Sequence, residues 1–123
     1  MRYITDRKRA NGMGAANHGT GRHWYMMVSA VGLAALVPIF IYYFGTALGQ
    51  GHEAVIAIFS RPLPAILTAL VLFFGMRHFA EGATVMIEDY AQGITRRLLV
   101  ICAQSFSYGL MAIGLFALAK IAL

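Results

Sequence analysis

The residues with the clearest potential for chemistry lie between Gly75 and Tyr90, directly after a charge-free apolar run from Leu63 to Met76. That run alone is too short to cross a bilayer, because a spanning helix needs about 20 mostly apolar residues. We therefore expect the helix to continue through Arg77, His78 and Glu81. Ionisable side chains at membrane depth are energetically costly and usually functional, so this segment is the candidate site.

His78 shares one face of the expected helix with two glycines. Because a helix turns about 100° per residue, Gly75, His78 and Gly82 fall on one face, and Asp89 lies further along it. A flat ligand could lie close to the backbone at the glycines while a histidine nitrogen reaches its centre. Haem is such a ligand, and histidine is one of its usual axial ligands. The spacing is therefore compatible with a haem site.

Ordinary packing between membrane helices explains the same residues. Arg77 and Glu81 are four positions apart, so they can pair on one face and partly neutralise each other. Glycines allow a neighbouring helix to approach, and a histidine can simply hydrogen-bond between helices. Residue types and spacing alone leave both interpretations open.

The composition is that of one small membrane domain. The chain has 123 residues, of which 59% are hydrophobic and 12% are charged, a balance typical of membrane proteins. The net charge is +5, but the positive residues flank apolar runs, which argues against nucleic acid as a partner. The single cysteine, Cys102, offers neither a disulfide framework nor a metal cluster. Nothing in the sequence builds the core of a soluble enzyme, and we assign no catalytic residue to this chain.

The apolar runs predict an all-α membrane protein with three transmembrane helices. A basic arm, residues 1–23, precedes a membrane domain, residues 24–123, with helices expected at about 24–44, 64–90 and 98–121. Pro38 is expected to kink the first helix, and residues 52–61 could form a short surface helix. Small and hydroxyl residues of the third helix suit packing in a membrane bundle: Ser105, Ser107, Gly109 and Gly114.

The positions of lysine and arginine predict the orientation in the membrane. The basic arm and Arg96–Arg97 lie on one side, whereas Arg61 and Lys120 lie on the other. The positive-inside rule then places the N-terminus in the cytoplasm and the C-terminus in the periplasm. In this orientation the Asp89–Tyr90 end of the second helix faces the cytoplasm, and His78 lies deeper in the membrane.

The second helix carries the pattern His-x3-Gly-x6-Asp-Tyr, formed by His78, Gly82, Asp89 and Tyr90. This pattern resembles the smaller membrane-anchor subunit (cytochrome b, D-type) of bacterial succinate dehydrogenase, respiratory complex II. The three-helix layout with a cytoplasmic N-terminus is similar as well. The approach to the first helix also resembles that of the bacterial anchor, at Gly12–Ala16, Gly19–Thr20, Trp24 and Val28–Ala30.

The resemblance implies a role in electron transfer from succinate to ubiquinone. His78 would be one axial iron ligand of haem b, and a second cytochrome b anchor subunit would supply the other. Tyr90 would hydrogen-bond a quinone carbonyl, and Asp89 would contribute to the electrostatics and proton supply of the same site. An iron–sulfur subunit and a succinate-oxidising flavoprotein would dock on the cytoplasmic face of the inner membrane. The residues expected in the vicinity of the haem are Gly75, Gly82, Arg22, His23 and Arg77.

One departure from the family concerns Met27, which stands where relatives often carry an arginine near the haem propionates. An uncharged methionine cannot pair with a carboxylate. The cation would then come from Arg22, His23 or Arg77, or from the partner subunit, and the sequence leaves this choice open.

A competing interpretation comes from another functional class. The chain could be a cofactor-free small helical transporter or membrane scaffold that uses the Arg77–Glu81 pair as an ion or substrate relay. A reduced-minus-oxidised haem b spectrum of the chain with its partners distinguishes the two interpretations.

Overall fold

Three long apolar helices make up the body of the protein. The computed structural model describes residues 5–10 and 19–123, and its long helices are α2 (Gly19–Ala47), α4 (Pro62–Tyr90) and α5 (Gly93–Ala122). The shorter helices are α1 (Asp6–Ala10) and α3 (His52–Phe59). All three long helices are long and apolar enough to cross a membrane. The predicted all-α fold with three membrane helices is confirmed.

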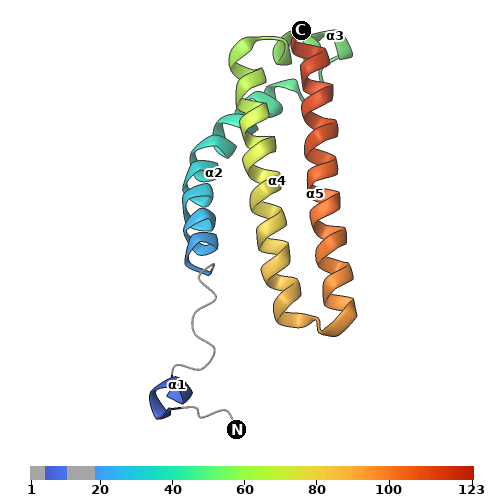
Figure 1. The fold of residues 1–123 in the computed structure, drawn as a ribbon. Helices are drawn as coiled ribbons and strands as arrows, with labels where there is room; N and C mark the ends of the chain where they lie inside the picture. Colours follow the sequence, from blue (N-terminus) through green and yellow to red (C-terminus); the bar gives the residue numbers. More distant parts are fainter. Residues whose placement is uncertain (1–4, 11–18) are drawn as a thin grey trace.

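The central helix of the bundle is α4, because α2 and α5 each pack on α4 and, in the described part of the chain, not on each other. The start of α2, the end of α4 and the start of α5 lie at one end of the bundle (Figure 1). The C-terminus and α3 lie at the opposite end. The up-down-up course therefore gathers the first turns of α2 and the last turns of α4 in one region.

The first long helix begins earlier than its apolar run predicts. The run predicts a start near Trp24, whereas α2 begins at Gly19 and includes Arg22 and His23 in its first turns. A helix of 29 residues extends about 43 Å, more than the roughly 30 Å of a hydrocarbon core. Helical hydrogen bonding therefore continues past the apolar part into the polar ends, where charged side chains are tolerated.

The other elements follow the sequence pattern with similar extensions. The third membrane helix, α5, begins at Gly93 and so contains the arginine pair that precedes its apolar run. The short helix α3 occupies the expected segment, and α2 continues through Pro38 as one helix that bends along its length (Figure 1). The stretch Gly12–Ala16, which contributes to the family resemblance, lies outside the described residues.

Local backbone chemistry fixes both ends of α4. Pro62 and Pro64 lie in its first turn, where a missing N–H removes no helical hydrogen bond. At the other end the chain turns through Ala91 and Gln92 into Gly93, whose φ of +61° is a conformation that favours glycine. This tight connection makes α4 and α5 an antiparallel hairpin.

Small residues allow α5 to approach α4 closely. A Cβ atom at Gly114 would lie 2.5 Å from Cδ2 of Leu72 on α4, so only glycine fits there without a shift. Ser107 is fully buried and donates its hydroxyl proton to the backbone oxygen of Ala103 at 2.7 Å. Ser105 and Gly109, in contrast, face outward. Two of the four small residues that we expected to serve helix packing therefore lie at this interface.

Candidate functional site

His78 is held by a hydrogen bond across the interface between α4 and α2. Its Nδ1 lies 2.8 Å from Oγ of Ser29, and Ser29 is buried, with 5% of its surface exposed. The hydroxyl of Ser29 also donates to the backbone oxygen of Met26 at 3.1 Å. Among the residues that the structure describes, Nε2 of His78 has no hydrogen-bond partner. The fold therefore holds one ring nitrogen and, among the described residues, leaves the other without a hydrogen-bond partner.

An open groove of about 350 Å³ lies between the start of α2 and the second half of α4. Its α4 wall begins one helical turn beyond His78, and its α2 wall carries polar groups. The residues that line it are Gly19, Arg22, His23, Met26, Gly82 and Val85. The groove thus brings together three of the residues expected near the haem, namely Arg22, His23 and Gly82.

The two glycines flanking His78 both lie against side chains of α2. A Cβ atom at Gly82 would lie 3.7 Å from Cε of Met26, and one at Gly75 would lie 3.9 Å from Cδ2 of Leu33. Both distances are ordinary van der Waals contacts. A Cβ would therefore fit at both positions, so packing within this chain does not require glycine at either, and Gly82 in addition lines the groove.

This face of α4 meets the requirements of a metal-bound histidine. Such a histidine usually donates its second ring N–H to a protein acceptor, which sets the tautomer and the ring orientation. Ser29 is placed to be that acceptor for His78. Arg22 and His23 line the same groove as Gly82 and could meet anionic groups of a ligand. These groups are compatible with a histidine ligand beside a groove that can hold anionic groups, although His78 itself is not among the residues that line the groove.

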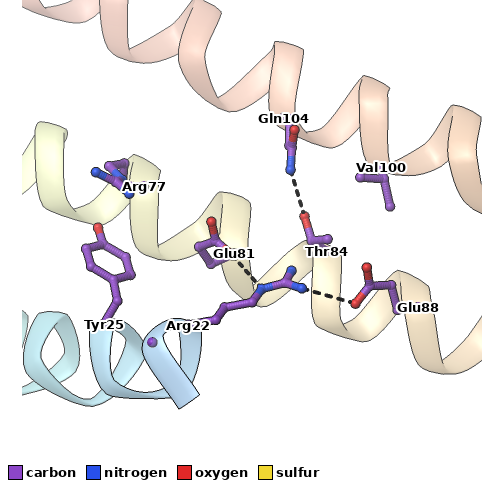
Figure 2. A pocket seen from close by; sticks show the side chains of 9 residues that line it. Arg22, Tyr25, Arg77, Glu81, Thr84, Glu88, Val100 and Gln104 are labelled. Atoms are coloured by element: carbon purple, nitrogen blue, oxygen red, sulfur yellow. Dashed lines mark hydrogen bonds and ion pairs between the residues drawn. The ribbon is translucent and has the colours of Figure 1, made fainter. Parts of the chain in front are cut away.

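A three-residue ion network joins the start of α2 to α4. Nε of Arg22 lies 2.7 Å from Oε2 of Glu81, and its Nη1 lies 3.2 Å from Oε2 of Glu88 (Figure 2). About a third of the Arg22 side chain is exposed. The predicted Arg77–Glu81 pair is therefore wrong. Glu81 pairs with Arg22 of the neighbouring helix α2. The guanidinium of Arg77 instead lies over the ring of Tyr25, 4.5 Å from its centroid.

A second, more polar cavity of about 500 Å³ lies between α2, α4 and α5. Arg77 and Tyr25 line it at one end and the Arg22 network at the other, while Gln104 of α5 hydrogen-bonds Thr84 of α4 at 3.5 Å (Figure 2). Nε of Arg77 and the hydroxyl oxygen of Tyr25 are buried and have no partner in the part of the chain that the structure describes. Arg77 thus lines a different cavity from the groove that holds Gly82.

Asp89 and Tyr90 are the last two residues of α4. Both are exposed, and Tyr90 retains 87% of its accessible surface. Within the described ranges Asp89 forms no ion pair. Both side chains are therefore accessible to a ligand or to another protein at the end of the bundle where α2 begins (Figure 1).

Sequence reasoning named Arg22 but missed Tyr25 and Ser29, the other polar side chains of α2 that meet α4. Arg22, Tyr25 and Ser29 lie at positions i, i+3 and i+7 of an otherwise apolar helix, which places them on one face. This stripe could have been detected from the sequence. The side chains that it meets on α4 depend on the rotation of the two helices, which the pattern does not specify.

The comparisons with known proteins point to the same family. The family model described as "Succinate dehydrogenase/Fumarate reductase transmembrane subunit" matches residues 1–112. The chain is 46% identical over 123 residues to the succinate dehydrogenase hydrophobic membrane anchor subunit of Paracoccus denitrificans, covering all of this chain and 95% of the relative. No solved structure matches the chain significantly. With a family match over most of its length and a relative of nearly equal length, the chain belongs to the transmembrane subunits of the succinate dehydrogenase/fumarate reductase family.

Proposed function

We propose that this membrane anchor subunit works in a bacterial succinate:quinone oxidoreductase, where it holds haem b and helps form the quinone-reduction site. Its family and its relative from Paracoccus support the anchor role, and its three apolar helices suit a multi-pass protein of the inner membrane. An iron–sulfur subunit and a flavoprotein would dock at its cytoplasmic end and deliver electrons from succinate. The chain alone would catalyse no reaction.

The observation that carries the haem assignment is the state of the two nitrogens of His78. Nδ1 is engaged by Ser29 across the helix interface, and Nε2 is free of partners among the described residues. We infer that Nε2 is one axial ligand and that a second anchor subunit provides the other. When bound, haem b supplies a one-electron redox centre inside the membrane.

Two residues of this chain are suited to meet the haem propionates. Arg22 has five N–H donors and uses two of them on Glu81 and Glu88, so three remain for a further anion. His23 follows it and lines the same groove. This arrangement offers a substitute for the arginine that relatives carry at the position of Met27. Arg77 remains a weaker proposal, because it lines the other cavity.

Asp89 and Tyr90 are proposed to form part of the quinone site. The positive-inside rule places the end of α4 at the cytoplasmic surface, where the iron–sulfur subunit would also dock. A phenol can donate a hydrogen bond to a quinone carbonyl, and the bond strengthens as negative charge develops on that oxygen. A nearby carboxylate can pass on protons from the cytoplasm. The exposure of both side chains leaves them accessible for this role.

The decisive experiment is purification of the tagged chain from its native membrane. We expect the flavoprotein, the iron–sulfur subunit and a second anchor subunit to copurify, together with a reduced-minus-oxidised haem b spectrum. His78→Ala should abolish or change the low-spin bis-histidine spectrum, whereas His52→Ala, a histidine of α3 at the opposite end of the bundle, should not. An unchanged spectrum and midpoint potential in His78→Ala would overturn the ligand assignment.

The main argument for the competing transporter or scaffold function does not hold in the structure. It relied on a relay through an Arg77–Glu81 pair, and Glu81 is paired with Arg22 instead. Copurification of the chain without haem and without the flavoprotein would restore that alternative.

A further inference from the structure

We propose that Ser29 is a positioning residue that fixes the tautomer and the orientation of His78, so that Nε2 presents its lone pair to the haem iron. This inference rests on the proposed ligation by His78 and identifies what prepares that histidine for it. It is carried by two hydrogen bonds of a single buried hydroxyl group.

The first step concerns the one proton of that hydroxyl. Oγ of Ser29 donates to the backbone oxygen of Met26, three residues earlier in α2. In the proposed arrangement the hydroxyl proton goes to Met26, because a carbonyl oxygen can only accept, and Oγ accepts from Nδ1–H of His78 across the 2.8 Å contact. With that direction of bonding the imidazole carries its proton on Nδ1. In the neutral ring this leaves Nε2 with a lone pair, which is the form that binds a metal.

The second step concerns orientation. Ser29 is buried, and its hydroxyl is tied to the backbone of α2, so the acceptor has a defined position. A Cβ at Gly82 on α4 would lie 3.7 Å from Cε of Met26, which belongs to the same turn of α2 as Ser29. One turn of α2, from Met26 to Ser29, thus lies beside both the histidine and the glycine that would border the haem. This turn fixes the ring relative to the groove.

The third step predicts what happens when the hydroxyl is lost. Nδ1–H of His78 would be left without an acceptor in an apolar setting, which is unfavourable. The tautomer with its proton on Nε2 would then compete, and that form cannot ligate. Donation of a hydrogen bond from Nδ1–H also makes the imidazole a more basic ligand, which favours ferric haem. Loss of the bond should therefore weaken haem retention and make the midpoint potential more positive.

The test uses the whole complex and the variants Ser29→Ala and Ser29→Thr. In Ser29→Ala we expect a lower haem-to-flavin ratio, haem retention weakened roughly ten- to hundredfold, and a more positive midpoint potential. Ser29→Thr keeps an oxygen that can bond in the same way, so it should restore both quantities toward the wild type. Ser107→Ala removes another buried hydroxyl that bonds its own helix backbone, and should leave the potential unchanged.

Each outcome decides the matter. If His78→Ala loses the haem spectrum while Ser29→Ala keeps the normal ratio and potential, the role of Ser29 is disproved and the proposed function stands. If His78→Ala keeps the normal spectrum and potential, the proposed function fails and this inference fails with it. An equal shift in Ser107→Ala would also disprove a specific role. Where Ser29→Ala does not assemble, Ser29→Cys replaces the hydroxyl with a weaker acceptor. Its potential must still move in the positive direction, and an unchanged value overturns the proposal.

Discussion

Nε of Arg22 lies 2.7 Å from Oε2 of Glu81, which joins the first turns of α2 to the middle of the second half of α4. The pair is partly exposed, with a third of the Arg22 side chain and a quarter of the Glu81 side chain accessible, so solvent weakens it. We expect a coupling of about 1 kcal/mol between Arg22→Met and Glu81→Gln. The double variant should therefore be less damaged than the sum of the single variants, as measured by the thermal stability of the purified complex.

Glu88 provides an internal comparison for the double-mutant cycle of Arg22 and Glu81. It contacts the same guanidinium at a longer distance, 3.2 Å, and is more exposed. Glu88→Gln should consequently cost less stability than Glu81→Gln. Equal costs, or strict additivity of Arg22→Met and Glu81→Gln, would show that Glu81 has a more important partner outside this chain.

A second prediction concerns Gly82 and separates a haem contact from simple helix packing. An added Cβ would make an ordinary 3.7 Å contact with Met26, and alanine favours helices over glycine by about 1 kcal/mol. Within this chain, Gly82→Ala should therefore be neutral or stabilising. If a macrocycle lies against Gly82, the same change should lower the haem-to-flavin ratio of the complex. Gly109→Ala, where nothing lies within 4 Å, is the matched control, and normal haem content in both variants would assign Gly82 to packing alone.

A third prediction concerns the seam between α4 and α5. A Cβ at Gly114 would lie 2.5 Å from Cδ2 of Leu72, so Gly114→Ala must displace that side chain or separate the helices. Overpacking of this kind typically costs about 1–3 kcal/mol, and the better helix propensity of alanine offsets about 1 kcal/mol of it, so a net loss of up to about 2 kcal/mol should appear as a lower melting temperature of the complex. Leu72→Ala removes the clashing atoms and leaves space for the added methyl group. The double variant should therefore be more stable than Leu72→Ala alone. Independent, additive effects would contradict this close approach.

The sequence predicted what depends on local pattern and missed what depends on helix rotation. Apolar runs were sufficient to predict three spans, because burial in lipid requires long uninterrupted stretches. Arg77 and Glu81 satisfied the i, i+4 rule. In the structure, however, Glu81 pairs with Arg22 of α2, and the guanidinium of Arg77 lies over the ring of Tyr25. Such pairings depend on which faces of two helices meet. The partner of His78 was missed for the same reason.

The last prediction separates a quinone role for Tyr90 from a role as an interfacial anchor. Tyrosine is common at membrane interfaces, and its 87% exposure is compatible with both roles. In Tyr90→Phe the ring remains and only the hydroxyl is lost, so anchoring should persist while a hydrogen bond to a quinone carbonyl disappears. We expect succinate oxidation with an artificial acceptor that bypasses quinone to survive, and quinone reduction to fall by about ten- to a hundredfold, as for loss of a hydrogen bond that strengthens during reduction. Tyr42→Phe, an exposed tyrosine near the other end of α2, should leave both reactions unchanged. Unaltered quinone reduction and inhibitor sensitivity in Tyr90→Phe would reduce Tyr90 to an anchor. A parallel collapse of both half-reactions would instead place the damage in docking of the soluble subunits and count against a direct contact with quinone.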